Sequence, residues 1–392
     1  MCERTLILNA DVYSSGAVKR NFGLFINENG RVADVFSMDD YRQSKYGDTC
    51  AVIRAKGLTV SPGLIDTHIH GIGGFATDDG SSSSILSMSE RLAEFGVTSF
   101  LPTLYAGRPE KMEKEILAVV NAMGKETGAR ILGMHLEGPF LNPAKCGAQD
   151  SMALSAPDES VFERLIKAGQ GKITAMTIAP ELNNVDKIAR IAKKKGIVLL
   201  MGHTDATYEE AKAGTDLGIF HATHMFNAMS PMNHKKPGVA GHVLFDKRMH
   251  CEVIADGVHV HKDVLKHLIK TKAQDKVVLI TDSLAPASLG EGSFVANGTN
   301  VVLGSAGAFF SQENPSLLCG SALTLNRAVA NVQRWCTDRA QAIRMATENP
   351  AKLYGFEGIG TIAKGTWADI ALFDENMEPA MVFIGGKRVF SR

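Results

Sequence analysis

The chain has 392 residues, of which 45% are hydrophobic and 21% charged, a composition typical of a globular enzyme with a large core. Its 42 Lys and Arg residues balance its 42 Asp and Glu residues, so it lacks the basic excess that nucleic-acid binders usually carry. No apolar stretch has the length of a membrane helix, and the N-terminus MCERTLILNADVY lacks a basic segment followed by an apolar run, so we expect neither a membrane anchor nor a signal peptide.

The two ends of the chain share one pattern. Residues 1–60 alternate apolar and polar side chains, with a turn signal at residues 27–30, and residues 361–390 do the same, with a turn at Gly385 and Gly386. A period of two is typical of strands with one exposed face. We therefore expect a small β-sandwich built from both termini, made of residues 1–60 and 356–392, around a hydrolase barrel at 61–355.

Short apolar runs and helix-like segments alternate through the middle of the chain. Runs of this length read as strands that are buried on both faces, and alternation with helices indicates a parallel sheet. The runs are GLIDTHIH (63–70), VTSFLPT (97–103), ILGMHLE (131–137), ITAMTIAP (173–180), IVLLMGH (197–203), IFHATH (219–224), CEVIAD (251–256) and VVLITD (277–282). Eight repeats predict an α/β fold of the (β/α)8 TIM-barrel type.

Seven of these eight runs end in a polar or ionisable residue. In (β/α)8 barrels the carboxyl ends of the strands carry the catalytic groups. His68 and His70 stand two apart and so share one face of the first strand, while Glu137, His203 and His224 end the third, fifth and sixth runs. Imidazole and carboxylate ligands suit zinc or iron, and these five groups can hold one or two divalent ions.

Asp282 ends the eighth run and is the natural general base. Taken singly, each residue has another interpretation, because a lone histidine at a strand end is more often structural and Asp282 could cap the following helix. Together they predict a metal-dependent hydrolase in which a metal-bound hydroxide attacks the substrate while Asp282 acts first as base and then as acid.

Several segments resemble a known family. They are PGLIDTHIHG (62–71), HLEGPFLNP (135–143), MGHTDA (201–206), THMFNAM (223–229), ADGVHVH (255–261), TENPAKLYGF (347–356) and GTIAKGTWADI (360–370). The chain thereby resembles the amidohydrolase superfamily, and most closely its N-acetylglucosamine-6-phosphate deacetylases. The resemblance covers nearly the whole chain.

The resemblance implies a role for each matching residue. Glu137, His203 and His224 match the metal ligands found throughout the family, and the pair His68 and His70 matches ligands that only some members retain. The other matches are Asp282 to the catalytic acid and base, His259 to a contact near the scissile amide, and Asn227 and Ala228 to the loop that receives the substrate phosphate.

Three departures concern substrate binding. Lys235, in LysLysProGly, stands where the family has an Arg that reaches the phosphate from the neighbouring subunit; it predicts a homodimer with a shared site, or else a solvated turn. Gln149 replaces a family His and is the candidate sugar contact. The segment 283–319 follows Asp282 in an unusual form and puts the identity of the sugar in doubt.

The resemblance implies deacetylation of N-acetylglucosamine 6-phosphate to glucosamine 6-phosphate and acetate. Three alternatives stay open: the N-acetylgalactosamine 6-phosphate epimer, another cyclic or N-acyl amide, and a catalytically dead scaffold barrel. Glu137 stands where cyclic amidases often carry a carboxylated Lys, which argues against them. Six scattered cysteines without a CxxC pair favour reduced thiols, so we expect a cytoplasmic enzyme that binds neither nucleic acid nor membrane.

Overall fold

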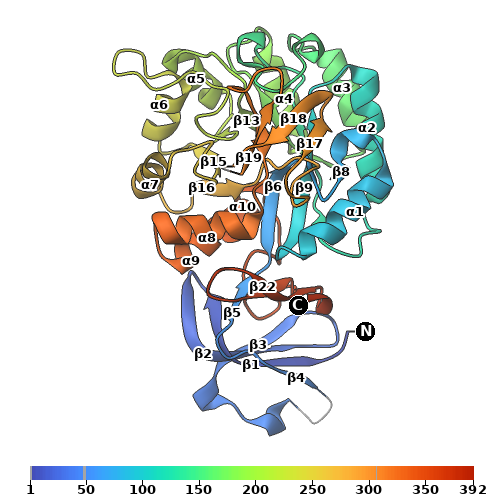
Figure 1. The fold of residues 1–392 in the computed structure, drawn as a ribbon, viewed down its shortest axis with the longest axis vertical. Coiled ribbons are helices and arrows are strands. Elements are labelled where there is room, and N and C mark those ends of the chain that lie inside the picture. The colour runs from blue at the N-terminus through green and yellow to red at the C-terminus, as the bar shows by residue number, and fades with distance from the viewer. Residues whose placement is uncertain (1, 47–49, 306) are drawn as a thin grey trace.

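A barrel of parallel strands occupies the middle of the chain (Figure 1). The computed structural model describes residues 2–46, 50–305 and 307–392. The barrel strands, in spatial order, are β6 (Leu64–Ile69), β9 (Val97–Tyr105), β11 (Met134–Glu137), β12 (Ile173–Ile178), β13 (Val198–Met201), β14 (His221–Ala222), β15 (His250–Ile254) and β16 (Val277–Ile280). A short strand, β10 (Arg130–Ile131), also pairs with β9. The last strand returns to the first, because the amide of Asp282 donates to the carbonyl of His68 at 2.9 Å. The predicted (β/α)8 fold is confirmed.

Helices, most of them amphipathic, cover the outside of the barrel. They are α1 (Ser82–Ala93), α2 (Pro109–Ala122), α3 (Glu159–Gly169), α4 (Val185–Lys195), α5 (Tyr208–Asp216), α6 (Gly238–Phe245), α7 (Lys262–Thr271) and α8 (Leu325–Trp335), followed by α9 (Arg339–Met345) and α10 (Glu348–Tyr354). In α4, Val185, Ile188, Ala189 and Ala192 are buried at helical spacing, and its three terminal lysines face solvent. Such one-sided burial fixes each helix against the sheet.

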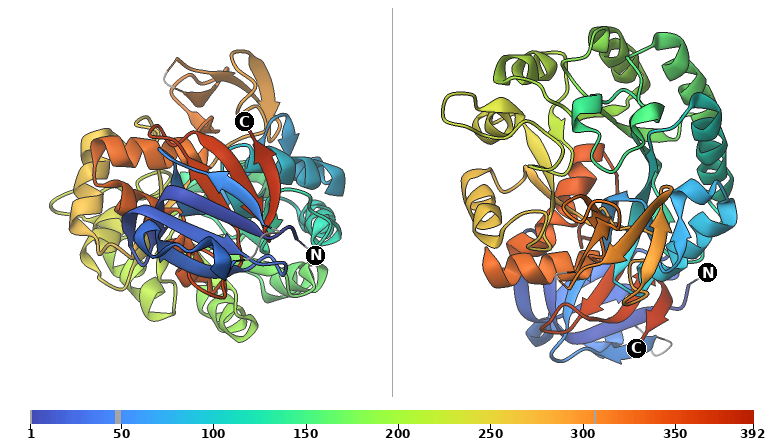
Figure 2. Two further views of the ribbon diagram at one scale, coloured as in Figure 1. Left: turned by 90° about the horizontal axis from the view of Figure 1, so that it is seen from below. Right: turned by 45° about the horizontal axis from the view of Figure 1, so that its top comes forward.

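The two ends of the chain meet in one sheet, drawn below the barrel in Figure 1 and seen from beneath in Figure 2. Its strands are β1 (Thr5–Ser14), β2 (Ala17–Ile26), β3 (Val32–Ser37), β4 (Ala51–Arg54), β5 (Thr59–Pro62), β21 (Ile370–Phe373), β22 (Pro379–Ile384) and β23 (Lys387–Ser391). The antiparallel pairing of β5 with β21 joins the termini, and Leu24, Val60 and Leu372 belong to a separate apolar core. The domain boundaries at residues 60 and 356 stay predictions.

The segment after Asp282 contains more structure than the sequence analysis expected. It forms an antiparallel sheet of β17 (Ser293–Ala296), β18 (Thr299–Leu303), β19 (Ala308–Ser311) and β20 (Leu318–Ser321). The carbonyl of Asp282 accepts from the amide of Ser321 at 2.9 Å, so the end of β20 is bonded to the chain just after β16. This sheet leans on the barrel at the front of Figure 2, right.

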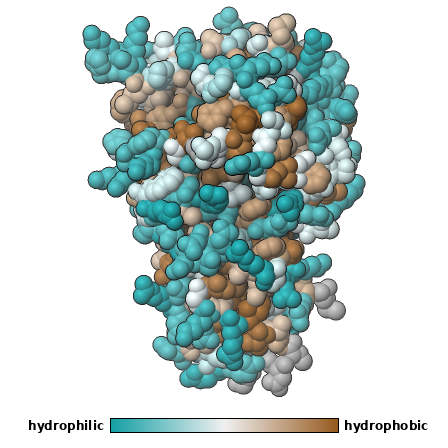
Figure 3. Space-filling view, viewed as in Figure 1, coloured by the Kyte–Doolittle hydropathy of each residue, from teal (hydrophilic) through white to brown (hydrophobic). Residues whose placement is uncertain are grey.

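The surface is mixed in character. Figure 3 shows hydrophilic residues over most of one face, with apolar residues exposed near the middle of the barrel and in the terminal sheet.

All six cysteines lie in the described part of the chain, and each is a free thiol. Among the described helices, none is long and apolar enough to cross a membrane.

Candidate metal centre and active site

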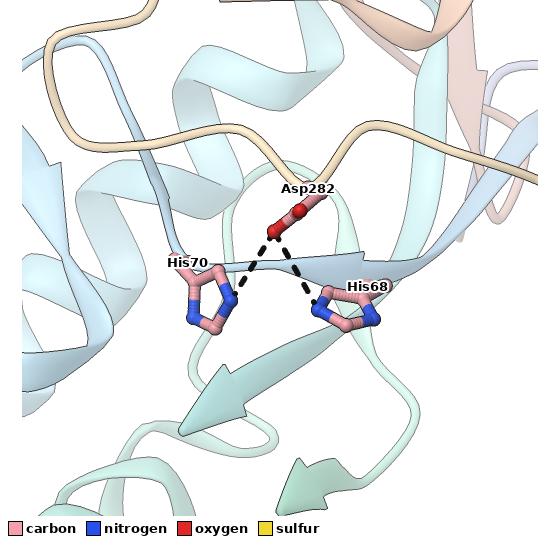
Figure 4. A group of neighbouring side chains, drawn as sticks. All are labelled: His68, His70 and Asp282. Atoms are coloured by element: carbon pink, nitrogen blue, oxygen red, sulfur yellow. Dashed lines mark ion pairs between the residues drawn. The ribbon is translucent and has the colours of Figure 1, made fainter. Parts of the chain in front are cut away.

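Six side chains from five strand ends meet at the mouth of the barrel. His68 lies on β6 and His70 directly follows it, Glu137 ends β11, and His203, His224 and Asp282 each follow their strand by two residues. Figure 4 shows that one carboxylate oxygen of Asp282 faces both histidines of β6. Parallel strands put their carboxyl ends together, which is why residues so far apart in sequence meet here.

Glu137 is the centre of this group. Its Oε1 lies 3.1 Å from Nε2 of His203, 3.0 Å from Nε2 of His224 and 3.4 Å from Nε2 of His68. Its Oε2 lies 3.2 Å from Nε2 of His70. On the opposite side, Oδ1 of Asp282 lies 3.3 Å from Nε2 of His70 and 3.6 Å from Nε2 of His68. All four imidazoles therefore point the same nitrogen inwards.

Backbone carbonyls hold three of these rings from behind. Nδ1 of His70 lies 3.0 Å from the Thr103 carbonyl, Nδ1 of His203 lies 2.9 Å from the Lys145 carbonyl, and Nδ1 of His224 lies 3.2 Å from the Asn227 carbonyl. A carbonyl can only accept, so each Nδ1 carries the proton and each Nε2 keeps a lone pair. This is the tautomer that a metal ligand needs.

Both carboxyl groups are anionic. Burial favours the neutral form of Glu137, but the imidazoles of His68, His203 and His224 outweigh it and hold its pKa well below the usual range. Burial acts in the same direction on Asp282, and His70 and His68 lower its pKa in turn. Burial lowers the pKa of His70, but the carboxylates of Asp282 and Glu137 raise it to about 10, so the two carboxylates favour a positive charge between them.

The donor set fits a divalent metal ion. Two subsets each bring their ligand atoms within 4.8 Å of one another: Glu137 with His203 and His224, and Asp282 with His68 and His70. Ligands about 2.1 Å from a tetrahedral ion lie roughly 3.4 Å apart, which matches these contacts. Within the described residues, Nε2 of His68 is buried and has no hydrogen-bond partner, as expected of an atom suited to bind a metal ion.

The backbone at three of these residues adopts a rare conformation. The φ angles of His203, His224 and Asp282 are 48°, 27° and 50°. A non-glycine residue with positive φ is strained, and such strain is commonly kept where function requires it. Here it turns each side chain from the strand end into the mouth of the barrel.

A cavity of about 210 Å³ opens over the group. Of the residues predicted to bind substrate, His259, Asn227, Ala228 and Gln149 line it. Lys235 is exposed and is not among the described residues that line this cavity. The structure thus brings together every predicted site residue except Lys235.

Two of the lining residues have firm partners. Nδ1 of His259 lies 2.6 Å from Asp256. Gln149 donates to Oε2 of Glu137 at 2.5 Å and accepts from the amide of Ala106 at 3.0 Å, so its amide orients a metal ligand. The sequence analysis assigned Gln149 to the sugar only.

Other lining residues were missed. Tyr105 stacks on the ring of His70, with centroids 3.8 Å apart, and lines the cavity. It is the last residue of β9 and could have been found as a further polar strand end. Leu284 and the β20 region, residues 317–320, also line the cavity. These residues lie beyond the last barrel strand, so only the tertiary structure brings them here.

Comparisons with known proteins agree with this geometry. The sequence profile of the amidohydrolase family matches residues 59–389. A protein of Bacillus subtilis named N-acetylglucosamine-6-phosphate deacetylase is 32% identical over 402 aligned positions, which cover 100% of this chain and 98% of the relative. A protein of Escherichia coli O157:H7 named N-acetylgalactosamine-6-phosphate deacetylase is 29% identical and covers 83% of this chain and 86% of its own length.

Solved structures give the same answer. A mutant N-acetyl-D-glucosamine-6-phosphate deacetylase of Mycobacterium smegmatis, in complex with N-acetyl-D-glucosamine-6-phosphate, superimposes with a TM-score of 0.90 at 27% identity. The match covers 99% of this chain and 100% of that one. The similarity therefore extends over both the barrel and the terminal sheet.

Proposed function

The chain belongs to the amidohydrolase family, and from this premise we propose that it removes the acetyl group from N-acetylglucosamine 6-phosphate. The products are glucosamine 6-phosphate and acetate. One observation carries the proposal: four Nε2 atoms converge on Glu137 with Asp282 opposite them, inside a cavity that a sugar can enter. The whole-length similarity to named deacetylases supports the choice of substrate.

The proposed cofactor is one or two divalent ions, zinc or iron. Glu137, His203 and His224 would hold one ion, and His68, His70 and Asp282 would hold a second. A bound ion supplies Lewis acidity, which polarises the acetamide carbonyl and lowers the pKa of a water molecule. Glu137 belongs to the first subset only, but its second oxygen faces His70 of the other subset.

Asp282 moves the proton in this proposal. Its carboxylate is anionic and takes a proton from the attacking water as the new carbon–oxygen bond forms. It then gives the proton to the sugar nitrogen as the carbon–nitrogen bond breaks. Asp256 holds Nδ1 of His259, which leaves Nε2 of that ring to contact the amide.

The proposed phosphate site is part of the same cavity. Asn227 and Ala228 line it directly. Lys235 would reach the phosphate from the partner subunit of a homodimer, because it does not line the cavity of its own chain. Two large apolar side chains near its loop, Met232 and Phe245, are 54% and 60% exposed, as expected of a surface that another copy covers.

The cytoplasmic location of the protein stays a prediction.

N-acetylgalactosamine 6-phosphate is the second candidate substrate. The relative from Escherichia coli named for that sugar is nearly as similar to this chain as the glucosamine relatives. Epimers differ in the direction of one hydroxyl group, and a site that hydrogen-bonds that hydroxyl separates them.

Acetate release from a panel of sugars tests the function. The panel contains both N-acetylated 6-phosphates and their unphosphorylated forms, and the metal content of the enzyme is measured first. We expect kcat/KM to be highest for N-acetylglucosamine 6-phosphate and to fall steeply without the phosphate. The matched control is His203→Ala, which should lose metal and turnover together. Absence of acetate from every phosphorylated substrate with metal-loaded protein would refute the proposal.

A further inference from the structure

The interior of the barrel beneath the metal centre is polar. Barrel cores are usually filled by branched apolar side chains. Here Glu252 of β15, His221 of β14 and His135 of β11 are fully buried, and Thr67 of β6 lies among them. A buried carboxylate costs folding free energy unless several donors satisfy it. We therefore expect this polar layer to have a functional role.

Three hydrogen-bond donors and the ring of His221 surround the carboxylate of Glu252. Nδ1 of His68 lies 3.2 Å from its Oε2 and the hydroxyl of Thr67 lies 3.1 Å from its Oε1. The Tyr354 hydroxyl and Nε2 of His221 approach the same Oε1 at 3.4 and 3.6 Å. Both carboxylate oxygens of Glu252 therefore accept a hydrogen bond, one from His68 and one from Thr67.

His68 differs from the other three ligand histidines in this contact. His70, His203 and His224 each use a backbone carbonyl to hold Nδ1, whereas His68 uses the side chain of Glu252. A carboxylate behind an imidazole fixes the tautomer and the ring orientation, and it also makes the metal-facing nitrogen more basic. The sequence analysis gave Glu252 no role, since it lies inside a strand.

We propose that Glu252 is a positioning residue for the second metal ion: it holds Nδ1–H of His68, so that Nε2 faces His70 and Asp282. This inference rests on the two-ion centre of the proposed function. The ion held by His68, His70 and Asp282 then depends on Glu252, and the ion held by Glu137, His203 and His224 does not. A strand interior thus controls how many ions the mouth of the barrel binds.

The same atoms argue against a metal site formed by Glu252 itself. His68, His135 and Glu252 bring one ligand atom each within 4.8 Å. Yet both oxygens of Glu252 already accept from donors, and Nε2 of His135 lies 2.8 Å from the Thr177 hydroxyl. An ion would have to displace the proton of His68 that Glu252 binds. Glu252 is better suited to orient a ligand than to be one.

Metal titration of two substitutions tests the inference. Glu252→Ala removes the acceptor, and Glu252→Gln keeps its shape and one acceptor oxygen but removes the charge. The metal-free enzymes are titrated with Co²⁺, whose visible absorption reports each bound ion, and elemental analysis gives ions per chain. We expect wild-type protein to bind two ions. Glu252→Ala should bind the first normally and the second about 10- to 100-fold more weakly, with Glu252→Gln between them.

A matched control separates positioning from general destabilisation. Glu115 of α2 is another buried carboxylate, 2% exposed and away from the metal centre, and Glu115→Gln should keep both ions. Recovery of the Glu252→Ala activity at high metal concentration also supports the inference. Two ions of wild-type affinity in Glu252→Ala, or equal weakening of both ions, would overturn it while leaving the proposed function intact. A wild-type chain with one ion would overturn the two-ion centre as well.

Discussion

Asp282 is held from both sides of its backbone. Its amide donates to the His68 carbonyl and its carbonyl accepts from the Ser321 amide, each at 2.9 Å. With φ at 50°, this backbone presents a carboxylate to both histidines of β6. The strand end and the β20 region therefore fix the base together.

Asp282→Asn should nearly abolish turnover. The amide has the shape of the carboxylate but cannot take a proton, and general acid–base groups typically contribute about 10²- to 10⁴-fold to the rate. We expect kcat for acetate release to fall by about that factor. The ion at Glu137, His203 and His224 should remain, because these ligands are untouched. A variant that keeps more than a tenth of the wild-type rate would remove Asp282 from the mechanism.

Gln149 offers a second test at the residue scale. Since its amide bridges Glu137 and the backbone of Ala106, we expect Gln149→Ala to weaken metal binding about 10-fold as well as to raise KM. Chelator competition measures the first effect and steady-state kinetics the second. If KM rises and metal affinity is unchanged, Gln149 contacts the sugar alone, as its place in the sequence suggested.

The proposed metal ligands could be predicted from the sequence because each ends an apolar run or, in the case of His68, stands two positions before such an end. Glu252 could not, since its neighbours on the same strand are apolar and its partner His68 is 184 positions away. Polar residues at the ends of apolar runs identify the side chains at the mouth of the barrel. They do not identify the layer of side chains beneath it, because that layer depends on which residues of different strands lie at the same height along the barrel axis.

At the level of elements, the barrel strands were predictable and the β17–β20 sheet was not. Barrel strands are buried on both faces and stand out as apolar runs, whereas β17 and β18 show mixed burial. One signal was nevertheless available. Asn297 and Gly298 have φ angles of 45° and 73°, the pattern of a type I′ hairpin turn, and AsnGly between alternating residues predicts such a hairpin.

Helix α2 buries the carboxyl group of Glu115, and burial of the charged form costs folding free energy. Burial raises the pKa of Glu115 to about 7, and Lys111, 3.6 Å away, compensates only in part. The pKa of Glu115 in the folded protein lies above its unfolded value of 4.5. The contribution of Glu115 to the free energy of unfolding is therefore greatest at low pH and is lost as the pH rises from about 4.5 to 7. The shift corresponds to at most about 3 kcal/mol.

Glu115→Gln should therefore flatten the pH dependence of stability. Relative to wild type, the free energy of unfolding of the variant should rise from pH 4.5 to about pH 7 and then level off. Chemical denaturation at several pH values measures it. Glu159, half exposed at the start of α3, provides a control substitution with little effect. A parallel pH dependence in the Glu115 variant and the wild type would show that Glu115 is not the group responsible.

For the whole molecule, a net charge of zero means that an anionic substrate must be met by local cations. Several histidines that face carboxylates line the cavity, and Lys235 is not among its lining residues. A second copy of the chain is the simplest source of the missing charge, and closed two-fold dimers are the commonest oligomers. Lys235→Ala should then raise KM for the phosphorylated sugar about 10-fold or more, with little change for the unphosphorylated one.

Mixing two impaired variants tests the shared site directly. A Lys235→Ala dimer lacks the phosphate contact in both sites, and a His203→Ala dimer lacks a metal ligand in both. In a heterodimer, one site combines the intact metal ligands of the first chain with the intact lysine of the second. Random mixing makes about half of the dimers heterodimers with one complete site of two, so co-refolded protein should recover about a quarter of wild-type activity at low substrate concentration. If activity after mixing only equals the average of the two parents, each site is completed by its own chain, and Lys235 is a solvated turn residue.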